Sequence, residues 1–556
     1  MGSTKKDSNF LVQGSILAAA SIISRIIGLL YRLPMTDIIG DTGNNYYSCA
    51  FEIYNIMLII SSYSLPLAVS KLVSARMAKG ERTAAYQILK GALVFATVAG
   101  CLVAIIVYFG AEYFTSMLQT PLSIFALQIL APVLIVVAVL GVLRGFFQGL
   151  GNMIPSAISQ IIEQIVNAIV SIWAAYVLFQ YGSKIGQVLG DPERYGAAYG
   201  AAGGTLGTNL GAVSALLFMI LVFSLYMRGF KRKMKREKNV EVDSFAYTMK
   251  ILVITIIPVL LSSTIYNISG IIDQGLFKNI ATMQGYTVNE IDVWWGVFSG
   301  KYKVLINVPI SIASAMAASS VPSLSASFSS GNKEEVNSRI NAAIRFIMVI
   351  AMPCCVGLAV LAKPIFTLLF PGTISSLDSA TTMMWVGAIA VVFYSLSTLT
   401  NGLLQGIDQM KIPVKNAAVA LVAHVILLIC LMLFFRLNIY AVVIANAFFA
   451  FLVCILNAIA LQRHSGYKQE FQKTFIIPAV SALGMGVLAY GVYALCFMIS
   501  KNNLVSIIVS ILFAVIVYAV ALLLLKGLTE DEIRKFPKGY LLVEVAKKLR
   551  LLKKIE

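Results

Sequence analysis

Four cations stand inside otherwise apolar segments, where they could bind an anion within a membrane. Arg25 and Arg32 lie in the first apolar run, and Lys301 and Lys303 lie in a later one. Arg25 is about 15 residues into its run, roughly 22 Å from the start of a helix and close to the bilayer midplane. A charge there costs at least about 2.5 to 3.5 kcal/mol, so it should face water, a counter-charge or a ligand. Arginine binds phosphate through two hydrogen bonds, whereas a lysine ammonium acts as a point charge.

The helix face that carries Arg25 and Arg32 is small and polar. Its members recur by threes and fours, and they are Gly14, Ala18, Ser21, Arg25, Gly28 and Arg32. The pattern indicates a helix that turns this stripe inward. The competing interpretations are that Arg25 pairs with a buried acid and that Arg32 reaches the outer interface. Lys301 and Lys303 point about 200° apart on a helix, so at most one faces a shared cavity squarely, or both reach outer headgroups.

Three acidic residues lie in or near apolar segments, namely Glu52, Glu163 and Asp273. We expect them to be counter-charges for the arginines, with coupling to sodium or protons as the alternative. His424 fits either a satisfied packing residue or a proton relay. The seven cysteines lack metal-ligand spacing, and neither a metal nor another cofactor is expected.

These residues must be positioned by membrane-spanning helices. Of the 556 residues 59% are hydrophobic and only 12% are charged, which is far from the composition of a soluble domain. Apolar windows of about 20 residues, each long enough to cross the bilayer, recur about fourteen times. The fold class is therefore an all-α polytopic membrane protein with about 14 transmembrane helices. The longest polar interruption, about 20 residues, is too short for a soluble catalytic domain, so we expect a transporter and no catalytic residues.

The basic residues indicate the orientation of the chain. Most of the 43 Lys and Arg fall in segments that share one side when the N-terminus is inside. Both termini should then be cytoplasmic, in a multi-pass protein of the cell membrane. Topology and anionic membrane lipids account for the net charge of +18, so no nucleic-acid partner is expected. Residues 529–556 alternate leucines with lysines and arginines, a pattern typical of a helix lying on the cytoplasmic leaflet.

An internal repeat predicts the domain organisation. The segment GFFQG at residues 145–149 matches GLLQG at 402–406, each followed by a Met at the matching position and then by a Pro, and residues 74–81 match 325–332 more weakly. This spacing predicts two parallel repeats of six helices each. The expected parts are an N-lobe at 1–227, a basic cytoplasmic linker at 228–250, a C-lobe at 251–465, an appended helix pair at 466–528 and the tail at 529–556.

Several motifs resemble one family. They are VLRGFFQG at 142–149, SQIIEQIV at 159–166, SRIIG at 24–28, LPLAVSK at 65–71 and IDQ at 272–274. They resemble the polysaccharide-transporter branch of the multidrug/oligosaccharidyl-lipid/polysaccharide (MOP) exporter superfamily, and within it the Gram-positive lipid II flippases and stage V sporulation protein B-like proteins. The resemblance implies two six-helix lobes around a V-shaped cavity, two extra C-terminal helices, and alternating access that moves an undecaprenyl-diphosphate-linked sugar outward.

The resemblance also bears on individual residues. Arg25 matches the family pattern best. The Gram-negative-type flippases carry an Arg-Asp pair six residues later, where this chain has Tyr31 followed by Arg32. The motif residues Arg144, Gln148 and Gly149, with Gln405 and Gly406 in the second repeat, are expected to have a structural or gating role.

The expected function is therefore a flippase or exporter of a lipid-linked cell-wall precursor, most simply lipid II. Its expected partners are the lipid-linked glycan diphosphate, anionic lipids and, as a further candidate, the cell-wall synthesis machinery. Coupling to the membrane potential, Na⁺ or H⁺ is left open. The alternatives are export of another lipid-linked oligosaccharide, such as a capsule, teichoic or spore-wall unit, and cation-coupled multidrug export. The latter would use membrane carboxylates such as Glu52 or Asp273. A membrane-embedded enzyme or scaffold is disfavoured because no paired carboxylate or metal cluster supports catalysis.

Overall fold

The computed structural model describes residues 2–63, 65–237 and 244–527, and every regular element in these ranges is a helix. Hydrocarbon offers backbone groups no hydrogen-bond partner, so a spanning segment must satisfy them internally, as a helix does. The chain divides into two compact units, Met1–Gly300 and Lys301–Glu556. The amphipathic tail expected at 529–556 lies outside the described residues.

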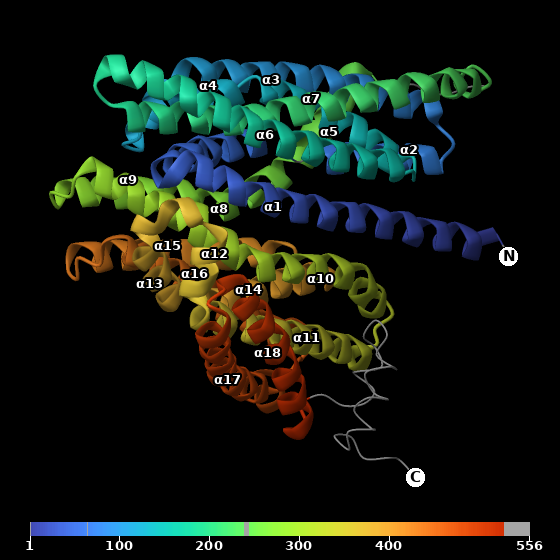
Figure 1. The fold of residues 1–556 in the computed structure, drawn as a ribbon. Coiled ribbons are helices and arrows are strands. Elements are labelled where there is room, and N and C mark those ends of the chain that lie inside the picture. Colours follow the sequence, from blue (N-terminus) through green and yellow to red (C-terminus); the bar gives the residue numbers. More distant parts are fainter. Residues whose placement is uncertain (1, 64, 238–243, 528–556) are drawn as a thin grey trace, which may run out of the picture. The chain divides into compact units, whose positions relative to one another are not determined.

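The described part of the first unit contains nine α-helices, traced from blue to green in Figure 1. With their short π- and 3₁₀-segments they are α1 (Gly2–Leu58), η1 (Ile59–Tyr63), α2 (Leu65–Ala78), α3 (Arg82–Met117), η2 (Pro121–Ser123), α4 (Ile124–Leu130), α5 (Val133–Gly149), α6 (Ile154–Leu189), α7 (Pro192–Met234), α8 (Phe245–Met283) and α9 (Val288–Val297). Helices α3, α5, α6 and α7 form a bundle, in which α6 and α7 pack along most of their lengths. Gly203 and Gly207 of α7 make this possible, because a Cβ there would overlap α6.

The second unit begins at Lys301, inside the π-helical segment η3 (Phe298–Tyr302). It contains α10 (Lys303–Ser329), α11 (Lys333–Val360), α12 (Ala362–Leu369), η4 (Pro371–Ser376), α13 (Leu377–Gly387), α14 (Ala390–Gly406), α15 (Lys411–Leu433), α16 (Asn438–Ser465), η5 (Gln472–Ile476), α17 (Ile477–Ser500) and α18 (Asn503–Leu524). The last two helices pack on each other, and α17 packs on α11. Their outer faces carry large exposed apolar side chains, as expected where a helix meets lipid.

Helix α1 is not one straight rod. At Gly40 the backbone leaves the helical conformation, with φ 69° and ψ −177°. Beyond this point the chain folds back. This is shown by the guanidinium of Arg32, which lies 5.0 Å from the ring centroid of Tyr47. In a straight helix these residues would be roughly 22 Å apart along the axis. Asn44 closes the bend by donating to the backbone oxygen of Gly40 at 2.8 Å.

The all-α membrane fold is confirmed, whereas the count of fourteen spans is not. Eleven helices of the described chain are long and apolar enough to cross a membrane, or up to twelve if the pair α13–α14, bent by 52°, is one span. One of the eleven runs from Ala19 to Ala78. Its 60 residues would extend about 90 Å as a straight helix, about three times the hydrocarbon thickness, so the bend at Gly40 lets it cross twice.

The two repeat segments have the same packing role in their own units. Gly145 and Gly149 let α5 approach α2, since a Cβ on Gly145 would lie 2.6 Å from the Pro66 oxygen. Gly402 and Gly406 let α14 approach α10, since a Cβ on Gly402 would lie 2.8 Å from the Ala317 Cβ. The loops that follow α2 and α10 each contain a glycine with positive φ, Gly80 at 80° and Gly331 at 74°. The lobe boundaries expected from this repeat stay a prediction.

Candidate functional site

The polar stripe of α1 faces the SQIIEQIV motif on α6. Ser21 donates to Gln160 Oε1 at 3.2 Å. Gly28 lies two turns beyond Ser21 on α1, and Gln164 lies one turn beyond Gln160 on α6. A Cβ placed on Gly28 would lie 3.6 Å from Gln164 Oε1. Residues at these spacings share a helix face, so the stripe predicted from the sequence contacts the first unit's interior.

Arg25 lies between Ser21 and Gly28 on this stripe. Its side chain is exposed, and it forms no hydrogen bond or ion pair with the described residues. No described residue is therefore the buried acid with which the competing interpretation pairs Arg25. A guanidinium in this state can offer paired N–H donors to a phosphate or carboxylate.

Glu163 is already engaged by Arg144, which reaches it from α5. Arg144 Nη2 donates to Glu163 Oε2 at 2.7 Å, and its Nε donates to Ser159 Oγ at 2.8 Å. Both charged side chains are mostly buried, at 14% and 22% exposure, so neither can be removed without leaving the other poorly solvated. The bond fixes the end of α5 against α6. Gln148, one turn beyond Arg144, is half-buried, and Gln405 in the second unit is exposed.

Arg32 has aromatic neighbours instead of a carboxylate. Its guanidinium lies 5.0 Å from the Tyr47 ring centroid and 6.0 Å from that of Phe51, both in the returning half of α1. Cation–π contacts of this kind stabilise a partly desolvated guanidinium. Arg32 therefore also supports the bend of α1, and its expected role in substrate binding stays a prediction.

Glu52 and Asp273 lie along the contact between α1 and α8. Gly270 of α8 faces the Glu52 carboxylate so closely that a Cβ would clash with it. Asp273 follows one turn later and is 1% exposed. Both residues have interactions within the protein. Their expected roles as counter-charges or ion-coupling groups stay predictions.

Lys301 and Lys303 belong to the second unit. Lys301 is 1% exposed, donates from Nζ to Ser376 Oγ at 2.5 Å and lies 5.9 Å from the Phe370 ring centroid. Lys303, at the start of α10, is half-buried. In this conformation the Lys301 ammonium is turned into its own unit, so contact with a ligand would require it to leave Ser376.

His424 of α15 is buried, and its Nδ1 lies 2.8 Å from the Ala445 backbone oxygen. This contact satisfies one ring nitrogen and favours the packing interpretation over a proton relay. In the described part of the chain no three His, Cys, Asp or Glu residues lie close enough together to hold a metal ion.

A second charged cluster in the first unit was not predicted. Lys278 is fully buried on α8, and its Nζ lies 3.1 Å from Asp292 Oδ1 and 2.6 Å from Thr120 Oγ1. Asn45 donates to the same Asp292 oxygen at 2.9 Å, and Arg194 Nη2 lies 3.6 Å from Oδ2. The sequence did not indicate this cluster, because the apolar window expected near residues 247–275 ends before Lys278, whereas α8 continues to Met283 and carries Lys278 into the interior.

Comparisons with known proteins agree with the family motifs. Residues 11–191 match the family model of polysaccharide biosynthesis proteins. The lipid II flippase MurJ of Bacillus subtilis is 24% identical over 494 residues, covering 86% of this chain and 88% of the relative. Stage V sporulation protein B of the same organism is 28% identical over 139 residues, covering 25% of this chain and 27% of that protein.

Solved structures show the same fold. A structure of the lipid II flippase MurJ in an inward closed conformation matches with a TM-score of 0.64 at 14% identity, covering 91% of this chain and 97% of that chain. An inward-facing multidrug resistance transporter of the MATE family matches with a TM-score of 0.61 at 14% identity, covering 79% of this chain and all of that one.

The chain has the multi-pass helical membrane fold of the MOP exporters, and the relatives and structural neighbours that match it are transporters or flippases, not enzymes. Within that superfamily, the comparisons support similarity to the polysaccharide-transporter branch. The resemblance seen in the motifs is thereby confirmed.

Proposed function

We propose that this protein is a flippase that moves an undecaprenyl-diphosphate-linked cell-wall precursor, most specifically lipid II, from the cytoplasmic to the outer leaflet of the cell membrane. Similarity to the lipid II flippase of Bacillus subtilis over most of both chains supports the substrate class. The observation that best supports a phosphate-bearing substrate is the state of Arg25. Its guanidinium is exposed on the stripe that contacts α6 and has no partner among the described residues.

The diphosphate of the precursor is the group that Arg25 would bind. Each phosphate offers a pair of oxygens that can accept two parallel hydrogen bonds from a guanidinium. Binding the phosphates would offset the cost of placing the Arg25 charge in the membrane. Ser21 and Gln160, bonded to each other one turn away, supply neutral polar groups beside it. The polyprenyl tail would remain in the lipid while the headgroup crosses by alternating access.

We further propose that the membrane potential assists transport. An anion that moves outward from a negative interior gains about 2.3 kcal/mol per charge per 100 mV. Coupling to Na⁺ or H⁺ through Glu52 or Asp273 is the competing proposal. Collapsing both ion concentration gradients while holding the potential distinguishes the two, because only ion coupling predicts that flipping then slows.

The test is the amount of lipid II exposed at the outer leaflet in cells where this protein is the only flippase and can be depleted. We expect depletion to remove outer lipid II, and Arg25→Ala to fail to restore it although the variant reaches the membrane. Lys184→Ala, which removes an exposed cation from α6 without a described partner, is the matched control and should restore it. Unchanged outer lipid II on depletion would eliminate the lipid II assignment.

A second candidate is export of a different polyprenyl-linked glycan, such as a spore-wall, teichoic or capsule unit. The similarity to stage V sporulation protein B over 139 residues favours keeping it. The same depletion experiment decides between them: normal outer lipid II with loss of another lipid-linked glycan from the cell surface would support the second candidate.

A further inference from the structure

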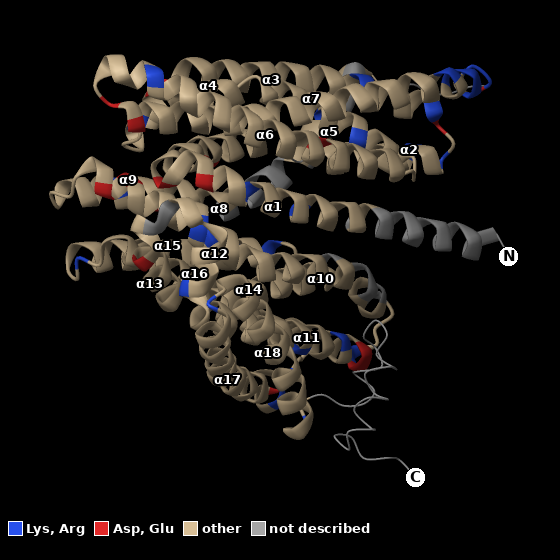
Figure 2. Cartoon of the chain, viewed as in Figure 1, with Lys and Arg blue, Asp and Glu red and all other residues tan. Residues whose placement is uncertain are grey.

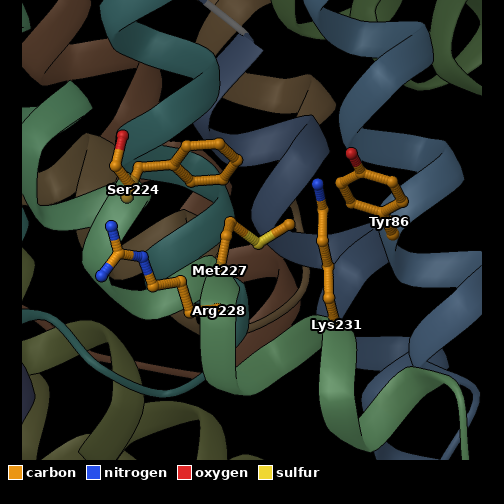
Figure 3. A pocket seen from close by; sticks show the side chains of 6 residues that line it. Tyr86, Ser224, Met227, Arg228 and Lys231 are labelled. Carbon is orange, nitrogen blue, oxygen red and sulfur yellow. The ribbon is translucent and has the colours of Figure 1, made fainter.

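A pocket with basic residues at its rim lies between the C-terminal end of α7 and the N-terminal end of α3. Its volume is about 260 Å³. It is lined by Tyr86, Phe223, Ser224, Met227, Arg228 and Lys231. Figure 3 shows Lys231 extending toward Tyr86, with Arg228 on the other side of Met227. The pocket is far from the Arg25 stripe in sequence and shares no residue with it.

The end of α7 is held against α3 by Glu237. The Glu237 carboxylate accepts hydrogen bonds from the backbone N–H groups of Arg82 at 2.8 Å and Thr83 at 3.0 Å, and from the Thr83 hydroxyl at 2.8 Å. Loss of hydration raises the pKa of this carboxylate, but these donors lower it by more, so its pKa lies below the usual range. The ionised carboxylate thus caps the first turn of α3, and the two helices that form the pocket are fixed relative to each other.

The rim of the pocket is positively charged, and no described carboxylate neutralises it. Arg228 and Lys231, one turn apart on α7, are exposed and form no ion pair with a described carboxylate. Lys90 of α3 lies next to the rim, with its Nζ 4.8 Å from the Tyr86 ring centroid. Figure 2 shows basic residues concentrated at this end of α7. With Lys231 and Lys90 on the Tyr86 side and Arg228 on the other side of Met227 (Figure 3), the rim offers three cationic donors suited to a phosphate group.

The floor of the pocket and the approach to it are apolar. Met227 is 5% exposed and packs in the core of the first unit. Leu217, Leu221 and Leu225, spaced by four, form an exposed stripe on α7 that ends one turn before Arg228. A ligand that fits this surface has a phosphate beside a hydrocarbon chain, because the rim would bind the former and the stripe the latter.

We propose that this pocket binds the phosphate headgroup of an anionic phospholipid, whose acyl chain lies along the leucine stripe of α7. The basic residues at this end of α7 then do more than set the orientation of the chain, because two of them form a lipid site. A soluble phosphate compound offers the same headgroup chemistry without the chain. The proposal does not depend on the transported substrate, since none of its residues belongs to the Arg25 stripe.

The test is retention of phosphatidylglycerol, compared with phosphatidylcholine, by the full-length protein in native mass spectrometry. Arg228→Gln with Lys231→Gln should weaken retention about thirtyfold, because each cation near a lipid phosphate contributes about fivefold. Arg232→Gln with Lys233→Gln removes the same charge from the same helix but leaves the pocket lining intact, and should retain the lipid. Tyr86→Phe, which keeps the shape and removes one donor, should weaken retention by about two- to fivefold.

Three results would overturn the proposal. They are full retention of phosphatidylglycerol by the Arg228→Gln/Lys231→Gln variant, equal loss in both charge-matched pairs, and equal retention of phosphatidylcholine. Glycerol 1-phosphate serves as the soluble arm. If it binds the pocket while phosphatidylglycerol does not, the ligand is a free phosphate compound and the lipid assignment is wrong. A matching thermal midpoint for the two double variants excludes misfolding as the cause of any difference.

Discussion

At the residue scale, two cations of the first unit have opposite environments. Lys278 is fully buried and surrounded by Asp292, Thr120 and the neighbouring Asn45, so its charge is compensated within the protein. Arg25 is exposed and has no described partner. A compensated charge serves the fold, whereas an uncompensated one is costly and is better explained by a ligand.

Lys278→Met should destabilise the protein strongly. Removing Lys278 leaves the buried Asp292 carboxylate with only the Arg194 guanidinium at 3.6 Å and the Asn45 amide, so we expect a loss near the lower end of about 3 to 5 kcal/mol in the free energy of unfolding. Denaturant titration of the purified protein measures it. The control is Lys363→Met, which removes a lysine 3.2 Å from Asp378 in a pair that is 61% and 89% exposed. That change should cost about 1 kcal/mol or less. Equal losses would show that the buried cluster contributes no more than a surface pair.

At the element scale, close helix approach depends on a few glycines, but their surroundings differ. A Cβ on Gly145 would lie 2.6 Å from the Pro66 oxygen and 2.9 Å from its Cα, which are backbone atoms of α2. A Cβ on Gly406 would lie 3.0 Å from Leu324 Cδ2, the end of a flexible side chain. The contact of α5 with α2 is therefore the less adaptable of the two.

Gly145→Ala should consequently cost more than Gly406→Ala. Overpacking against a backbone costs about 1 to 3 kcal/mol, so Gly145→Ala should lower the thermal midpoint measured in detergent. At Gly406 the near atoms all belong to the Leu324 side chain, which needs to shift by only a few tenths of an ångström, and alanine favours the helix by up to about 1 kcal/mol, so the midpoint should change less than at Gly145. A larger loss at Gly406 than at Gly145 would contradict this account of the two contacts.

At the scale of the whole molecule, the expected topology can be tested through α7. Its 43 residues span about 64 Å, enough to cross the membrane, with Glu193 exposed in its first turn and Arg236 exposed just beyond its last. In a variant whose seven native cysteines are replaced, an impermeant thiol reagent should label Glu193→Cys in intact cells. It should label Arg236→Cys only after permeabilisation. The reverse pattern would place both termini outside and contradict the orientation predicted from the basic residues.

The sequence by itself determined the class of the protein, the helical membrane fold and the stripe around Arg25. These depend on local properties, because the length of an apolar run, the helical period and the signs of charges can be read along the chain. The repeat could also be recognised in the sequence, because two glycines four residues apart in each segment predict a close contact with a neighbouring helix.

Only the tertiary structure decided which charges are compensated. Glu163 is bonded to Arg144, Lys301 to Ser376 and Lys278 to Asp292, and each pair joins different elements. The bend at Gly40, which brings Tyr47 to Arg32, is likewise a property of one backbone angle. The physical reason is that burial and pairing depend on distances between segments remote in sequence, and periodicity along one helix carries no information about the helix packed against it.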